Sequence, residues 1–200
     1  GTGGGRPVSD GNDGLANPCA SIANIPVEVA EADWPIRIER YGLVPDSGGA
    51  GRHRGGLAIE RSWRALAPDT RLQVRSDRQR HQPYGLAGGL PGATSSNVVL
   101  RRDGTREQLP PMFGAVLEPG DVFHHRMAGG GGWGDPLARD PDAVARDVLD
   151  EKVTRAAARA EYGVLLRDDG SVDEAGTAAL RRERAASAPP GPACRHPRAR

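Results

Sequence analysis

Apolar and polar residues alternate with a period of two in several short segments of the first two-thirds of the chain, which is typical of β-strands. In one such segment Leu57, Ile59, Trp63 and Ala65 fall on one face, while Glu60, Ser62 and Arg64 fall on the other. The pattern predicts strands over residues 36–44, 57–65, 71–75, 97–102, 105–109 and 121–127. Because these strands are short and separated by turn residues, we expect an antiparallel sandwich or barrel-like sheet, preceded by a loop-rich stretch at 1–35.

The dipeptide Asp103-Gly104 lies between two of these segments. It is typical of a type I′ hairpin turn, in which both central residues have positive φ. Pro119-Gly120-Asp121 is expected to turn the chain into the last strand.

After residue 135 the period changes to that of helices. Asp140 is expected to cap a helix that begins at Pro141 and carries an apolar stripe. Its members are Val144, Val148 and Leu149. Thr154 should cap a second helix ending at Tyr162-Gly163, and Asp173 a third that runs to about Arg184. The predicted class is α+β: a β-rich domain at 1–135, a helical tail at 136–186 and a disordered end at 187–200, where a proline-rich basic run cannot build a core.

The run from Gly129 to Pro136 satisfies G-x-G-x-x-G and follows a predicted strand, as a dinucleotide-phosphate loop does. However, Asp135-Pro136 follows at once, so no helix begins inside the glycines. The βαβ unit and its later acidic residue are also missing. The run therefore favours a glycine turn that allows close backbone packing or positive φ.

Composition narrows the function classes. Hydrophobic residues make up 37% and aromatic residues 4% of the chain, so the core should be modest, and 28 glycines with 17 prolines should turn the chain often. The net charge of +1, with arginines interleaved among carboxylates, predicts a solvated surface and no nucleic-acid partner. No apolar run is long enough to span a membrane.

The ends of the chain suggest its context. No secretory signal is visible, and Cys19 and Cys194 lie at opposite ends, so a reducing cytoplasm is expected. The abrupt glycine-rich start suggests a piece of a longer chain.

Metal-binding chemistry is not indicated. His124 and His125 are neighbours on a predicted strand, so their side chains should point to opposite faces and cannot both bind one ion without a bulge. This favours solvated or packed histidines. The spacings H-x-x-x-H, C-x-x-C and H-x-H do not occur, and Lys152, the only lysine, belongs to no Walker A motif. We expect no metal site made wholly within this chain.

A polar cluster covers residues 73–81, where a predicted strand runs into a loop rich in glycine and proline. Strand ends that open into long loops often carry sites. Arg75 and Asp77 would share a face and could pair as an orienting or anion-binding unit. The alternative is a surface ion pair that anchors the loop.

Several motifs occur in a fixed order. They are Asn24-Ile25-Pro26-Val27-Glu28, Pro35 to Tyr41, Asp46 to Arg52, Arg54-Gly55-Gly56, Arg75-Ser76-Asp77-Arg78, Tyr84 to Gly89, and Gly129 to Pro136. Together they resemble the C-terminal portion of the hydantoinase B / 5-oxoprolinase family, which includes the acetone carboxylase α subunit. The resemblance covers nearly all of residues 1–186.

The resemblance implies ATP-dependent opening of a cyclic amide by two components. A hydantoinase A-like partner would bind ATP and phosphorylate the amide oxygen, and the B component would complete hydrolysis. The divalent metal would belong to an N-terminal region of the B component that is absent here, so this segment itself is expected to bind no cofactor. Residues 19–24 differ from the His-x-His-Met-Thr-Asn version of the family, which leaves the substrate open.

Ring opening needs a polarised carbonyl, a positioned water and charge stabilisation. Candidate catalytic residues are Asp77, Arg78 and Arg75; candidate substrate-binding residues are Asn24, Glu28, Gly129 and Gly131. The leading hypothesis is a segment that shapes the site and docks the A-type partner in a hetero-oligomer. The alternative is a β-rich assembly module without catalytic residues.

Overall fold

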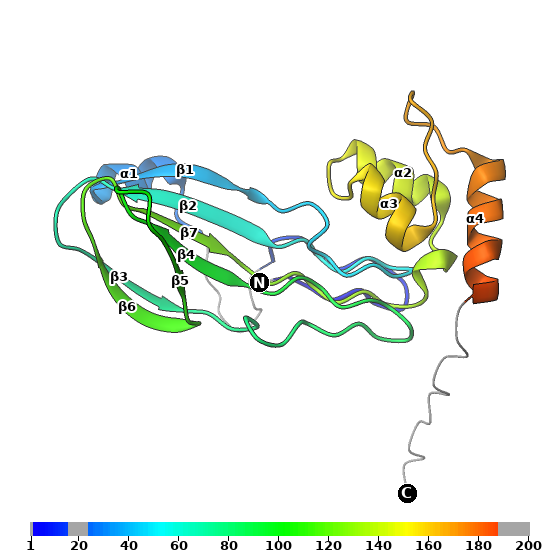
Figure 1. Cartoon of the computed structure of the whole chain (residues 1–200), viewed down its shortest axis with the longest axis horizontal. Helices are drawn as coiled ribbons and strands as arrows, with labels where there is room; N and C mark the ends of the chain where they lie inside the picture. Colours follow the sequence, from blue (N-terminus) through cyan, green and yellow to red (C-terminus); the bar gives the residue numbers. More distant parts are fainter. Residues whose placement is uncertain (1, 16–23, 188–200) are drawn as a thin grey trace, which may run out of the picture.

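The computed structural model describes residues 2–15 and 24–187, and Figure 1 shows its elongated shape. The strands are β1 (Ile36–Leu43), β2 (Ile59–Ala65), β3 (Thr70–Arg75), β4 (Ser96–Leu100), β5 (Arg106–Leu109), β6 (Met112–Leu117) and β7 (Val122–Arg126). The helices are α1 (Val27–Asp33), the short 3₁₀ turn η2 (Pro136–Ala138), α2 (Pro141–Leu149), α3 (Arg155–Tyr162) and α4 (Glu174–Ser187). No helix of the described ranges is long and apolar enough to cross a membrane.

Two antiparallel sheets form the β-rich part. One has the strand order β1-β2-β7-β4-β5, and the other pairs β3 with β6. The core between them contains buried Ala65, Val99, Leu117 and Phe123, and the Phe123 ring meets the rings of Trp63 and Phe113 edge-on at 5.8 and 6.0 Å between centroids. The predicted antiparallel β-rich fold with a C-terminal helical tail is therefore confirmed.

The sequence pattern missed two elements. The loop-rich stretch predicted at 1–35 contains the helix α1, which begins after Pro26; only Ala30 of this helix is buried, so it has no apolar stripe to reveal it. Strand β6 was also missed, because its residues are all apolar or glycine and the sequence therefore shows no alternation of polar and apolar side chains there. The strand predicted over 57–65 begins at Ile59, although Leu57 is buried.

The turn at Asp103-Gly104 is not type I′. Gly104 has φ +90°, but Asp103 has no positive φ. The Gly104 N–H donates to the Arg101 carbonyl (2.9 Å), and the Arg101 N–H donates to the Thr105 carbonyl (2.8 Å). This pattern fits a longer hairpin loop with a single left-handed glycine, in which the Asp103 carboxylate accepts from the Thr105 N–H.

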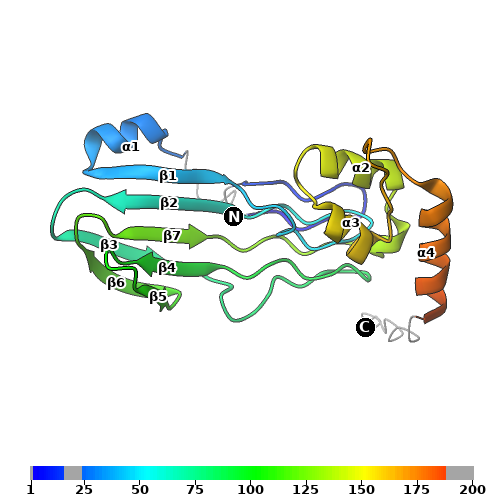
Figure 2. The same cartoon turned by 45° about the horizontal axis from the view of Figure 1, so that its top comes forward.

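Glycine-rich segments connect the sheets to the helices. Residues 3–5, 47–56, 84–92 and 129–134 lie side by side (Figures 1 and 2), and we call them the glycine bundle. Their backbones bond directly: the Gly130 N–H donates to the Gly56 carbonyl (2.8 Å), and the Gly5 N–H to the Gly131 carbonyl (2.8 Å). A Cβ on Gly131 would overlap the Tyr84 carbonyl oxygen. The glycine run from Gly129 was expected to allow either close backbone packing or positive φ. Close packing explains residues 129–132, and positive φ occurs in the run only at Gly134.

The helical tail follows its predicted caps. The Asp140 and Thr154 side chains accept from the N–H groups of Asp142 and Ala157, and Gly163, with φ +63°, ends α3. The Asp173 carboxylate accepts from the Gly176 N–H at the start of α4. Val144 is buried with Ala158, Tyr162 and Val164. Leu149 of the predicted stripe is instead 83% exposed, because it lies at the end of α2.

The three-part division at 135 and 186 stays a prediction. The predicted disordered end overlaps α4 at Ser187, the last residue of that helix, and its remainder at 188–200 lies outside the described residues. Cys19 and Cys194 lie outside them too.

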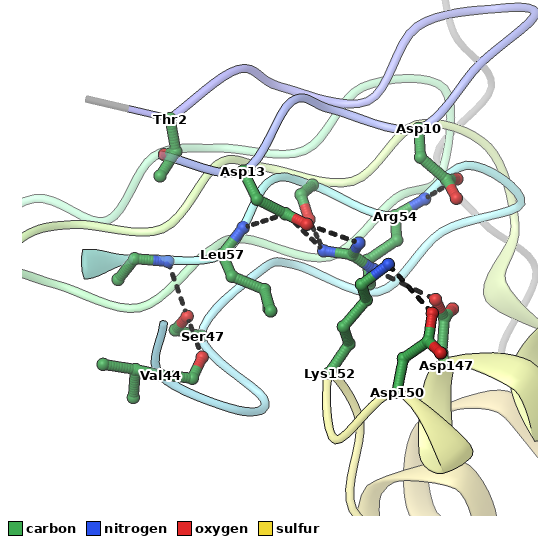
Figure 3. Close-up of polar contacts among 12 residues, drawn as sticks. Thr2, Asp10, Asp13, Val44, Ser47, Arg54, Leu57, Asp147, Asp150 and Lys152 are labelled. Carbon is green, nitrogen blue, oxygen red and sulfur yellow. Dashed lines mark hydrogen bonds and ion pairs between the residues drawn. The ribbon is translucent and has the colours of Figure 1, made fainter. Parts of the chain in front are cut away.

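A buried charge network joins the tail to the glycine bundle (Figure 3). Arg54 is 3% exposed; its guanidinium contacts Asp13 (3.1 Å) and Asp147 of α2 (3.7 Å). Arg139 bonds both carboxylate oxygens of Asp10 (2.6 and 2.7 Å) and also Asp147 (2.7 Å). Because the buried Asp147 and the partly exposed Asp10 and Asp13 each meet a guanidinium, the network joins α2 to the N-terminal loop.

Candidate functional site

A cavity of about 700 Å³ opens where β3 and β7 end beside the glycine bundle. The end of β3 contributes Arg75 to its wall, the segment after β3 contributes Asp77 and Arg78, and the glycine run contributes Gly129 and Gly131. The fold therefore brings together five of the residues selected from the sequence, from segments about 50 positions apart.

The side chains of Arg75, Asp77 and Arg78 are exposed, and within the described ranges none of them makes a hydrogen bond or ion pair. Arg75 and Asp77 thus do not form the pair considered above, either as an orienting unit or as a loop anchor. The backbone anchors this segment instead, since the Ser95 N–H donates to the Arg78 carbonyl (3.2 Å) and the Ser95 hydroxyl donates to the Asp77 carbonyl. Arg78 has φ +55°, an uncommon value for a residue with a side chain.

Asn24 and Glu28 lie elsewhere. Asn24 donates to the Tyr41 hydroxyl (2.7 Å) and accepts from Arg61, whose guanidinium stacks 4.4 Å from the Tyr41 ring centroid. It borders a separate groove of about 590 Å³ between α1 and β1–β2, and Glu28 is exposed on α1. The fold does not bring these two residues to the cavity.

His125 is a cavity residue that the sequence reasoning passed over. It lies directly opposite Asn97 in the β4–β7 pairing, and its Nδ1 is 2.7 Å from the Asn97 Oδ1. Asn97 is fully buried, and its Nδ2 donates to the Ser76 hydroxyl and to the Pro110 carbonyl, both at 2.9 Å. The sequence did contain one signal for this pair. His125 lies two positions after Phe123 and Asn97 two positions before Val99, so each shares the inward face of its strand with a core residue.

The two histidines point to opposite faces, as predicted from their adjacency. His124 approaches Glu60 at 3.7 Å on the other face of the sheet, and this distance exceeds that of a hydrogen bond. Glu60 itself is 7% exposed and also pairs with Arg40, so the polar face of β2 is more covered than an alternating pattern alone indicates.

Burial lowers the pKa of His125, and the Ser96 backbone, which favours the charged ring, offsets part of that effect; His124 and Arg61 lower the pKa further. Burial also lowers the pKa of His124, against the attraction of Glu60. Both shifts favour the neutral form of the imidazole.

The glycine run is not arranged as a phosphate cradle. The N–H groups of Gly129, Gly130, Gly132 and Gly134 donate to backbone carbonyls of other segments at 2.8–3.0 Å. A phosphate loop leaves such groups free for its ligand. Separately, no cluster of three or more His, Cys, Asp or Glu side chains suited to a metal ion occurs within the described residues.

A family model described as Hydantoinase B/oxoprolinase matches residues 1–136. The chain belongs to this family. The B component of a putative D-/L-hydantoinase from a Pseudomonas species is 34% identical over 182 residues, which cover 90% of this chain and 30% of that protein. The resemblance inferred from the sequence motifs is thus confirmed.

Two solved structures share the fold. The ATP-dependent caprolactamase from Pseudomonas jessenii superposes with a TM-score of 0.77 at 30% identity, over 90% of this chain and 32% of the other. A nucleotide-free acetone carboxylase gives 0.75 at 27% identity, over 92% and 30%. The chain of 200 residues spans less than a third of the length of each of these relatives.

Proposed function

We propose that this chain is a C-terminal segment of the B component of an ATP-dependent cyclic-amide hydrolase. In this proposal it forms part of the substrate site and docks a hydantoinase A-like partner in a cytoplasmic hetero-oligomer. ATP would bind to the partner, and a divalent metal would bind to another region of the B component. The segment itself would hold neither.

The observation that carries the proposal is the cavity at the end of β3. Its border includes one carboxylate and two arginines, whose side chains have no partner among the described residues. Guanidinium groups stabilise an oxygen that gains negative charge, as the carbonyl oxygen does during attack on an amide. Exposed charged side chains on an anchored backbone suit contact with a ligand or with a neighbouring segment.

The alternative is an assembly module in which the same side chains contact only protein. It shares the family membership and the fold. It differs in predicting that substitutions in the cavity weaken assembly and leave the turnover of the assembled enzyme unchanged.

The test uses the complete two-component enzyme with Asp77→Asn and Arg78→Gln, each assayed for ATP-dependent hydrolysis of hydantoin, 5-oxoproline and caprolactam. We expect turnover to fall at least tenfold while size-exclusion chromatography shows an intact complex. Arg159→Gln is the matched control, because Arg159 is exposed on α3, away from the cavity. Unchanged turnover of both cavity variants would favour the assembly module.

A further inference from the structure

His125 occupies a setting that the proposed catalytic residues do not explain. A half-buried imidazole lines the cavity, and one of its nitrogens is bonded to a fully buried amide. Its Nε2 makes no hydrogen bond within the described ranges, and it is not among the buried polar atoms left without a partner. The nitrogen that can reach a ligand is therefore Nε2.

The orientation of the Asn97 amide determines which nitrogen of His125 carries the proton. The Pro110 carbonyl can only accept a hydrogen bond, so the Asn97 atom 2.9 Å from it must be the donor nitrogen Nδ2. Flipping the amide would place two oxygens against each other. The Oδ1 atom consequently faces His125, and a carbonyl oxygen can only accept.

Nδ1 of His125 must then be the protonated nitrogen, since it donates to Oδ1 over 2.7 Å. In the neutral ring the remaining nitrogen, Nε2, carries a lone pair and acts as an acceptor. The Ser96 backbone favours the charged ring, but the geometry of the imidazole is fixed by its 2.7 Å contact with Asn97.

We propose that His125 Nε2 is a hydrogen-bond acceptor of this cavity, and that it binds the N–H of a small cyclic amide or imide. Beside His125 the cavity holds the Asp77 carboxylate, which also accepts, and Arg75 and Arg78, which can only donate and so suit a carbonyl oxygen of the ligand. A ligand with an N–H beside a carbonyl matches an imidazole acceptor and guanidinium donors at once. The identity of the ligand rests on the proposed function; the acceptor role of His125 rests on the Asn97 contact alone.

The first experiment reads the tautomer directly. Nitrogen-15 NMR of the labelled 200-residue chain above the pKa of His125 should show a protonated Nδ1 and a bare Nε2. Hydantoin should then shift the Nε2 resonance, whereas 1,3-dimethylhydantoin, which has no N–H, should not. Ser76→Ala should preserve the tautomer, because the Pro110 carbonyl still orients the Asn97 amide. A protonated Nε2, or no hydantoin-induced shift, would overturn the proposal.

The second experiment compares His125→Phe with His124→Phe in the complete enzyme. Loss of one hydrogen bond should weaken hydantoin binding about five- to tenfold in the His125 variant. The His124 variant, altered on the opposite face, should bind as the unmodified enzyme does. Equal affinity in the two variants would overturn the proposal.

The NMR measurement needs no substitution at His125, so it decides the question even if His125→Phe misfolds. The two proposals also fail separately. An enzyme that binds hydantoin through Nε2 but never hydrolyses a cyclic amide would refute the proposed function and leave the acceptor role standing.

Discussion

At the scale of single residues, buried charges in this chain have several partners each. Asp121 is the clearest case, with a side chain only 3% exposed. Its carboxylate accepts from the N–H groups of Arg102 (2.9 Å) and Glu118 (3.1 Å) and from the guanidinium of Arg101 (2.8 Å). Burial alone would raise the pKa of Asp121, but these donors outweigh burial and hold it below its ordinary value of 3.8.

We expect Asp121→Asn to lower the free energy of unfolding by about 2–3 kcal/mol at pH 7, because the amide presents a donor to groups that themselves donate. A lowered carboxyl pKa stabilises the fold fully above the unfolded-state pKa, and this contribution is lost as pH falls through the folded-state value. The difference between the two proteins should therefore shrink below about pH 4.

Urea denaturation at pH 7 and at several values below pH 4 measures this difference. Asp103→Asn is the control, since Asp103 is exposed and the asparagine oxygen can still accept from the Thr105 N–H. It should change stability by less than about 0.5 kcal/mol. A constant deficit in Asp121→Asn down to the lowest pH would contradict the explanation.

At the scale of elements, the sequence predicted those features that are stabilised by interactions between residues close together in the chain. The caps at Asp140, Thr154 and Asp173 lie next to the N–H groups they bond, so sequence reasoning located α2, α3 and α4 well. The turn at Asp103-Gly104 was placed correctly and assigned the wrong type. Its geometry depends on how β4 and β5 pair, which the dipeptide alone does not specify.

The candidate site shows the same contrast between residues that are close together in the chain and contacts that depend on the order of the strands. Arg75, Asp77 and Arg78 could be selected because they are consecutive or nearly so at a strand end. His125 and Asn97 are 28 positions apart, and only the strand order places β7 beside β4. Periodicity gives the face on which a side chain lies but not the neighbouring strand, so their contact could not be predicted.

We expect the helical tail to depend on Arg139 more than on its own caps. Arg139→Met would leave Asp147 buried without its closest cationic partner, which we expect to cost about 3–5 kcal/mol of unfolding free energy. Amide hydrogen exchange should accelerate most in α2 and α3. Both quantities can be measured on the purified chain.

Lys152→Met is the matched control. Lys152 pairs with Asp150 at 3.1 Å, but the two side chains are partly exposed, so the pair should contribute less than about 1 kcal/mol. If the two variants lost equal stability, the buried network would not be what holds the tail.

At the scale of the whole molecule, backbone contacts between glycines connect the sheets and the helices. In the glycine bundle, segments distant in sequence approach so closely that side chains cannot fit between them. Such packing explains the glycine content better than turns do. Only seven of the glycines in the described ranges have positive φ, and none of these lies in 129–132. The glycine content was interpreted as frequent turns, because composition alone does not show which segments lie side by side in the fold.

Gly131 tests this view, because it borders the cavity and also lies within the bundle. In Gly131→Val the new side chain would overlap the Tyr84 carbonyl and force apart the segments that carry residues 84–92 and 129–134. Overpacking of this kind costs about 1–3 kcal/mol or more, a large share of the stability of a small domain. We expect a lower melting temperature or insoluble protein.

Gly42→Val is the control, since a Cβ on Gly42 of β1 meets nothing within 4 Å and a β-branched residue suits a strand. Thermal melts of both variants, followed by turnover in the complete enzyme, separate the two roles of the run. If Gly131→Val melted normally yet abolished turnover, the run would act through the ligand and the packing explanation would be wrong.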